Sequence, residues 1–244
     1  MSEEGRRGTE VGKIPKWESE LWSYISKSDG IHCPIYESCI LRLRGEWCLS
    51  ENEQYYRLMN DFLDNEALDI NDPATLEFEL RGCRHMGRIF SLVRILAVKY
   101  QMEAGIARLP VSSELITHDS ENTPIEVQEL PFKSHHGAIW RLSDCWLIQL
   151  NANDTPARKR FTKYHEIFHV LAHNKTTPVF KKMSSSPAGS FNELLADHFS
   201  ANMLMPAPKV KESWAEVQDI DQMATIFEVP KSVVWFALKS MNLV

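Results

Sequence analysis

The spacing of apolar residues divides this chain into a helical stretch, a β-like stretch and a second helical stretch. Helical spacing between capping or breaking residues predicts helices at about 86–104, 155–173, 191–205, 220–227 and 231–241. The first of these helices ends at Gly105. The second has a typical start at Thr155-Pro156, because threonine caps a helix and proline suits its first position. The pattern from Trp17 to about Leu80 is also mostly helical.

The stretch between about 109 and 150 has a β-like pattern instead. Two apolar runs, Ala138–Leu142 and Cys145–Leu150, are joined by the polar turn Ser143-Asp144. Apolar runs of this length around a tight polar turn predict a β-hairpin. We interpret Cys145 as a small core residue of the second run.

Composition and charge narrow the classes of protein that the pattern allows. The 244 residues are 43% hydrophobic and 25% charged, which excludes collagen-like, coiled-coil and wholly disordered chains. A formal net charge of -6 argues against a general nucleic-acid-binding protein, because phosphate binding needs a basic surface. The sequence shows neither a signal peptide nor an apolar run that could span a membrane, so we expect a cytoplasmic protein.

The most informative string is His165-Glu166-Ile167-Phe168-His169, an H-E-x-x-H motif on a predicted helix. Residues four apart share a helix face, so both imidazoles could bind one Zn²⁺ ion. Glu166 would then lie close enough to take a proton from the water that the ion activates. The neighbouring apolar residues predict a mostly buried helix, and burying two histidines and a glutamate without a metal or other partners would be costly. The sequence therefore predicts a catalytic metal site rather than ordinary core or surface histidines.

A catalytic zinc site needs a third protein ligand. His173 continues the stripe of the two histidines, but it lies about 12 Å along the helix axis from His165, too far to share one ion. A second pattern, with a histidine six residues after His169, fails because position 175 is a lysine.

Glu193 is the better candidate for the third ligand. It could instead cap its own helix, because Ser190-Phe-Asn-Glu193 reads as a capping box. Asp197, four residues later on the same face, favours the ligand interpretation, because its carboxylate could accept the second ring N–H of a ligand histidine. A cap needs no such partner.

The residues around this motif resemble those of the ImmA/IrrE family of zinc metallopeptidases, which has a gluzincin-type site. The resemblance covers about residues 86–240 and rests on Arg160-Phe161-Thr162, the HEIFH string, His173, Glu193-x-x-Ala196-Asp197-x-Phe199-x-Ala201 and Leu204-Met205-Pro206. It implies that His165, His169 and Glu193 bind zinc and that Glu166 is the catalytic base. It further implies a protein substrate, commonly a DNA-binding repressor of stress responses or mobile elements.

Two features depart from the family pattern. Tyr164 stands before the first histidine, where a small residue is usual, and about 80 N-terminal residues lie outside the motif. The motif does not identify the group that stabilises the oxyanion, and Tyr164 and His198 are the candidates. We interpret His135-His136 as a solvated turn rather than as transition-state donors.

The N-terminal region carries a second set of candidate metal ligands. Its four cysteines, Cys33, Cys39, Cys48 and Cys83, could assemble a structural zinc or iron–sulfur site. The spacing of the first three is not that of a zinc knuckle, so reduced thiols in a helical appendage are the alternative to a metal. The chain has five cysteines, an odd number, which fits either interpretation better than a disulfide framework.

We therefore predict an α+β fold, with a small mixed or antiparallel sheet packed on the H-E-x-x-H helix and a second ligand helix. Four parts are expected: a disordered tail at 1–14, a helical cysteine-bearing segment at 15–85, a zinc peptidase core at 86–206 and a C-terminal helical segment at 207–244. The last helices resemble a helix-turn-helix, but their charge is not basic, so a core-packing role is preferred to direct nucleic-acid binding.

The predicted function is zinc-dependent cleavage of a peptide bond in a protein partner, with a helix-turn-helix repressor as the expected substrate. The alternative is a zinc-dependent regulator that binds such a repressor without cleaving it; the presence of Glu166 favours the enzyme. We expect the Cys145–Leu150 run to offer an exposed edge that pairs with an extended substrate segment, and the 174–190 loop to act as a lid.

Overall fold

The computed structural model describes residues 14–27, 84–106, 108–173 and 191–244. The described elements are α1 (Lys16–Ser26), α5 (Arg84–Ala104), β1 (Ile125–Leu130), β2 (Gly137–Arg141), β3 (Trp146–Asn151), α6 (Pro156–His173), α7 (Phe191–Leu204), α8 (Ala207–Val217), α9 (Ile220–Phe227) and α10 (Lys231–Ser240). Helices around a small mixed sheet make this an α+β fold, as predicted.

Four of the sequence-based predictions concern residues that lie wholly or mostly outside the described ranges. They are the tail at 1–14, the helical pattern beyond residue 27, the 174–190 loop and the second metal site, because Cys33, Cys39, Cys48 and Cys83 all lie outside these ranges. A structural metal bound by these four cysteines therefore stays a prediction. The fifth cysteine, Cys145, is described and is a buried free thiol, as expected for a small core residue.

The sheet confirms the predicted hairpin but changes the position of its second strand. β2 and β3 pair antiparallel, with Ile139 opposite Ile148, and β1 pairs parallel with β3 on the other side. The strand order is therefore β1-β3-β2. The prediction that the Cys145–Leu150 run offers an exposed edge is wrong, because β3 is hydrogen-bonded on both sides. The edge next to the helix belongs to β2 instead.

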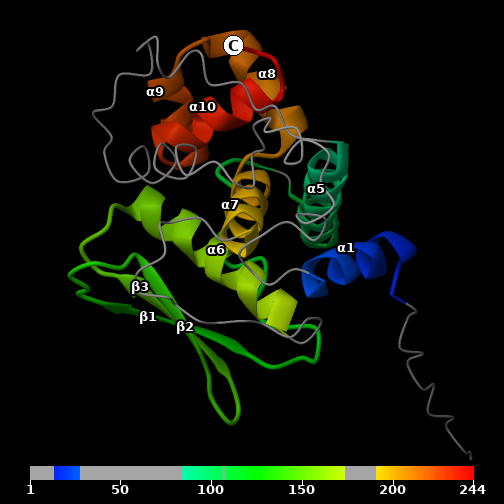
Figure 1. The fold of residues 1–244 in the computed structure, drawn as a ribbon. Coiled ribbons are helices and arrows are strands. Elements are labelled where there is room, and N and C mark those ends of the chain that lie inside the picture. The colour runs from blue at the N-terminus through cyan, green and yellow to red at the C-terminus, as the bar shows by residue number, and fades with distance from the viewer. Residues whose placement is uncertain (1–13, 28–83, 107, 174–190) are drawn as a thin grey trace, which may run out of the picture.

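Helix α6 lies between the sheet and the other helices (Figure 1). Ile148 and Leu150 of β3 alternate inward and pack beneath it, and Phe161, Ile167 and Phe168 of α6 are buried at 2% exposure or less. Helix α7 packs along the opposite side of α6, and α5 packs along α7. The two predicted ligand helices are therefore neighbours in the core.

The N-terminal and C-terminal helices share this core. Trp22 of α1 lies 6.3 Å from Phe168, measured between ring centroids, so α1 packs against the C-terminal half of α6. Met223, Phe227 and Val233 of the last two helices are buried as well. This confirms the core-packing role that the sequence predicts for α9 and α10. No helix in the described ranges is both long and apolar enough to cross a membrane.

Candidate metal centre

The start of α6 is fixed by the residues that the sequence singles out. The Thr155 hydroxyl accepts a hydrogen bond from the Arg158 backbone N–H at 3.2 Å, and Pro156 occupies the first helical position. Threonine thereby binds one of the N–H groups that a helix start leaves without a partner inside the helix. From this start, the spacing of 3.6 residues per turn directs His165 and His169 toward α7.

The imidazoles of α6 and a carboxylate of α7 converge on one small volume. The His165 Nε2 atom lies 3.2 Å from the His169 Nε2 atom and 3.0 Å from an oxygen of Glu193. The other Glu193 oxygen is 3.3 Å from His169 Nε2. Within the described residues this is the one group of three side chains arranged to hold a metal ion, with ligand atoms within 4.8 Å of one another.

These distances fit a metal centre. Ligand atoms about 2.0–2.1 Å from a tetrahedral ion are about 3.3 Å apart, close to the separations of the three side chains. The donor set of two imidazoles and one carboxylate suits a divalent transition metal and leaves a fourth position for water or substrate. Half of the Glu193 side chain is exposed, whereas the two histidine side chains are 9% and 15% exposed. The centre is therefore buried on the α6 side and open beside Glu193.

Asp197 holds the first histidine in a ligand orientation. Its Oδ1 atom is 2.8 Å from His165 Nδ1, so the ring directs Nε2 toward the other two side chains. A ligand histidine commonly donates its second N–H to a carboxylate in this way, which fixes the tautomer. Burial lowers the pKa of His165, but the hydrogen bonds to Asp197 and Glu193 outweigh it and raise that pKa well above its usual value. Carboxylates that favour a proton here also favour a cation.

Glu166 directly follows His165 on α6. Its carboxylate lies against the first residue of β2: a Cβ atom added to Gly137 would be 2.6 Å from Glu166 Oε1. The sequence gives a weak signal for this contact, because an isolated glycine in a strand often marks a close approach of another group. Gly137 was not among the residues predicted to belong to the site.

The two candidates for oxyanion stabilisation face away from the three converging side chains. The Tyr164 hydroxyl donates to the Ser112 carbonyl oxygen at 2.6 Å, and burial raises its pKa above the usual value. The His198 ring packs on Phe90 of α5, with Nε2 3.2 Å from the Phe90 carbonyl oxygen. Burial lowers the pKa of His198 to about 4. Neither position supports the oxyanion role.

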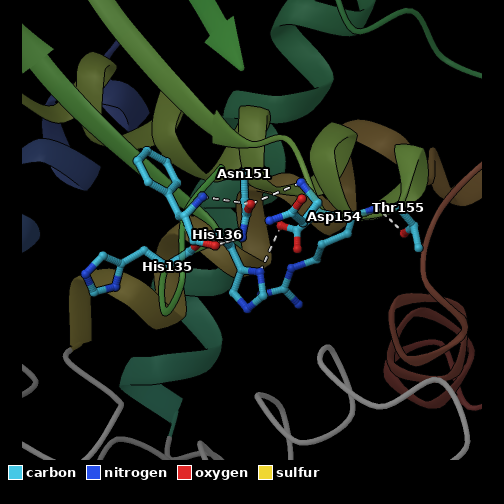
Figure 2. Close-up of polar contacts among 8 residues, drawn as sticks. His135, His136, Asn151, Asp154 and Thr155 are labelled. Carbon is cyan, nitrogen blue, oxygen red and sulfur yellow. Dashed lines mark hydrogen bonds and ion pairs between the residues drawn. The ribbon is translucent and has the colours of Figure 1, made fainter. Parts of the chain in front are cut away.

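The remaining histidines near the motif take other positions. His173 lies edge-on to Trp146 with 4.7 Å between ring centroids, which agrees with its exclusion as a ligand. His135 is exposed, as expected for a solvated turn. His136 is only partly so, because its Nδ1 atom lies 2.9 Å from Asp154 (Figure 2).

An α+β fold in which two helices bring H-E-x-x-H histidines together with a glutamate is the architecture of a metallopeptidase-like protein. Residues 120–239 match the family model Peptidase_M78, described as the IrrE N-terminal-like domain. This stretch of the chain therefore carries a domain of the ImmA/IrrE family, which is a peptidase family. A search of curated proteins found none that matches the chain. The family match includes β1 to β3 and α6 to α9, and ends within α10.

Proposed function

We propose that this protein is a zinc-dependent endopeptidase that hydrolyses a peptide bond in a protein partner. The observation that carries the proposal is the convergence of His165 Nε2, His169 Nε2 and the Glu193 carboxylate within 3.0–3.3 Å. In this proposal these three side chains hold one zinc ion and Asp197 orients His165. When bound, zinc would supply Lewis-acid activation of water and of the substrate carbonyl.

The remaining chemistry belongs to Glu166. A carboxylate next to the ligand histidines can take a proton from the attacking water and later deliver it to the leaving amine. Attack of the water on the carbonyl carbon first forms the new C–O bond; the peptide C–N bond then breaks as the proton removed from water is delivered to the leaving amine. Glu166 is not one of the three clustered side chains, so the proposed arrangement gives it the proton transfer and not metal binding.

The proposed substrate is a DNA-binding transcriptional repressor of the helix-turn-helix class. The support is membership of the ImmA/IrrE family, together with the net charge of -6, which disfavours direct binding to DNA by this chain. Cleavage would relieve repression, in a stress response or in the control of a mobile element. A repressor substrate would place the reaction in the cytoplasm.

The test is to incubate the purified protein with the repressor-like product of a neighbouring gene, with and without a chelator. Glu166→Gln keeps the shape of the side chain and leaves the three metal ligands intact. We expect this variant to retain zinc and partner binding while cleavage falls by about 10²–10⁴-fold, the usual contribution of a general base.

A different outcome would favour a regulator that binds without cutting. If Glu166→Gln relieved repression in a cell reporter as well as the wild type does, binding alone would account for the activity. If neither protein changed the partner and chelation had no effect, the peptidase proposal would be wrong.

A further inference from the structure

Gly137, the first residue of β2, lies so close to α6 that a residue with a side chain would not fit there without a shift. A Cβ atom built on Gly137 would lie 2.6 Å from Glu166 Oε1 and 2.6 Å from Thr162 Cγ2. Such separations are far inside van der Waals contact, so one of the three groups would have to move. The backbone of Gly137 is not in the left-handed region. Among the described glycines, only Gly105 has a positive φ. Space, rather than backbone conformation, therefore requires glycine here.

The strand is held at this distance by a buried asparagine. Asn151, at the end of β3, accepts a hydrogen bond from the Phe132 N–H at 3.1 Å through its side-chain oxygen. Its amide nitrogen donates to the carbonyl oxygens of Phe132 and His135, at 3.3 and 3.0 Å. Its backbone N–H donates to the His136 carbonyl oxygen at 2.9 Å. These bonds fix the loop that leads directly into Gly137 (Figure 2).

The same loop is tied to the start of α6. The His136 Nδ1 atom lies 2.9 Å from Asp154 Oδ2, and Asp154 directly precedes the capping residue Thr155 (Figure 2). The beginning of β2 and the beginning of α6 are therefore connected to each other as well as to β3. A strand held from both sides cannot easily withdraw from the helix to make room for a larger residue.

We propose that Gly137 is a positioning residue for Glu166: the missing side chain opens the space that the carboxylate occupies, and the Asn151 hydrogen bonds keep the strand against it. The role of Glu166 as base rests on the proposed function. A general base must lie within hydrogen-bond reach of its proton, and displacement by about 1 Å can reduce the rate by about 10²-fold. Gly137→Ala would cause such a displacement.

The contact itself is testable without a substrate. We expect Gly137→Ala to lower the thermal midpoint by several degrees in the wild-type background. In a Thr162→Ser/Glu166→Ala background, which lacks both atoms that the new Cβ would meet, the loss should largely disappear. Gly87→Ala is the matched control, because a Cβ at that helical position meets nothing within 4 Å and should not lower the midpoint.

Equal losses in the two backgrounds would overturn the proposal. If Gly137→Ala does not fold at all in the wild-type background, folding of the same substitution in the Thr162→Ser/Glu166→Ala background supports the proposal, and failure there contradicts it. This cycle measures stability, so its result is independent of whether the protein proves to be a peptidase.

The consequence for catalysis needs a second readout, on the partner protein that the wild type cleaves. We expect Gly137→Ala to bind as much zinc as the wild type and to lose about 10²-fold in kcat, with KM little changed. It should cause no further loss in a Glu166→Gln protein, because the base is already absent. Unchanged kcat, or an equal loss in both backgrounds, would overturn the positioning role. An inactive wild type would instead count against the proposed function and leave the stability cycle to decide on Gly137.

Discussion

Helix α6 carries polar side chains on two faces, and the two faces bind different kinds of partner. On one face, Tyr164 donates to the Ser112 carbonyl and Lys163 pairs with Glu114 at 2.6 Å. On the other face, His165 and His169 meet side chains of α7, whose carboxylates converge on the rings. Polar residues occur on both faces of this helix, so composition does not distinguish the faces.

The polar residues on the two faces differ mainly in whether they meet backbone or side-chain groups. Arg160 lies on the same face of α6 as Tyr164 and donates to the carbonyl oxygens of Val111 and Glu228, at 2.6 and 3.1 Å. Backbone carbonyls are fixed, so each such bond ties the helix to one neighbouring segment. In the candidate metal centre, by contrast, the Nε2 atoms of His165 and His169 and the Glu193 carboxylate meet one another, an arrangement that a cation would stabilise.

Among substitutions that leave His165, His169 and Glu193 in place, Asp197→Asn is expected to have the largest effect on metal affinity. The substitution keeps the shape but removes the charge that holds His165, so metal affinity should fall by about 10–100-fold. A chelator competition with zinc measures this. Asp154→Asn is the matched control, since Asp154 pairs with His136 outside the cluster and should not alter the affinity. Equal losses in both variants would mean that the Asp197 contact has no special relation to the metal.

A smaller effect, on stability, is expected on the face of α6 that carries Tyr164. Tyr164→Phe removes the donor to the Ser112 carbonyl, and the free energy of unfolding should fall by about 1–3 kcal/mol because that acceptor is partly buried. Zinc affinity should stay unchanged, which separates the two faces. Tyr24→Phe, at a partly exposed tyrosine whose hydroxyl is 3.4 Å from Glu20, serves as the control and should cost less than about 0.5 kcal/mol. Loss of zinc in Tyr164→Phe would contradict the assignment of this face as structural.

The sequence predicts the helices that carry the site residues better than it predicts the segments that pack against them. The i, i+4 spacing of His165 and His169 and the capping pair Thr155-Pro156 are local, so the pattern alone gives α6 and the direction of its histidines. The placement of Asp197 against His165 also follows from helical spacing once Glu193 is taken as a ligand. These residues lie where the spacing places them.

The features that the sequence did not predict depend on contacts far apart in the chain. The apolar alternation of β3 shows which residues point inward, but it does not show that β1 pairs on its other side. The close approach of Gly137 to Glu166 depends in the same way on the loop bonds of Asn151. Helix α8 is a different case: it lies in the segment predicted to be helical, at 207–244, but its own bounds were not predicted, although Pro208 in its first turn was a local signal.

The binding of one metal ion by His165, His169 and Glu193 is tested most directly by the zinc content of the purified protein. In a cysteine-free background, which removes any N-terminal thiolate site, we expect about one zinc per chain and a steep loss in His169→Ala. The same zinc content in the His169→Ala protein as in its parent would show that these three side chains do not hold the ion.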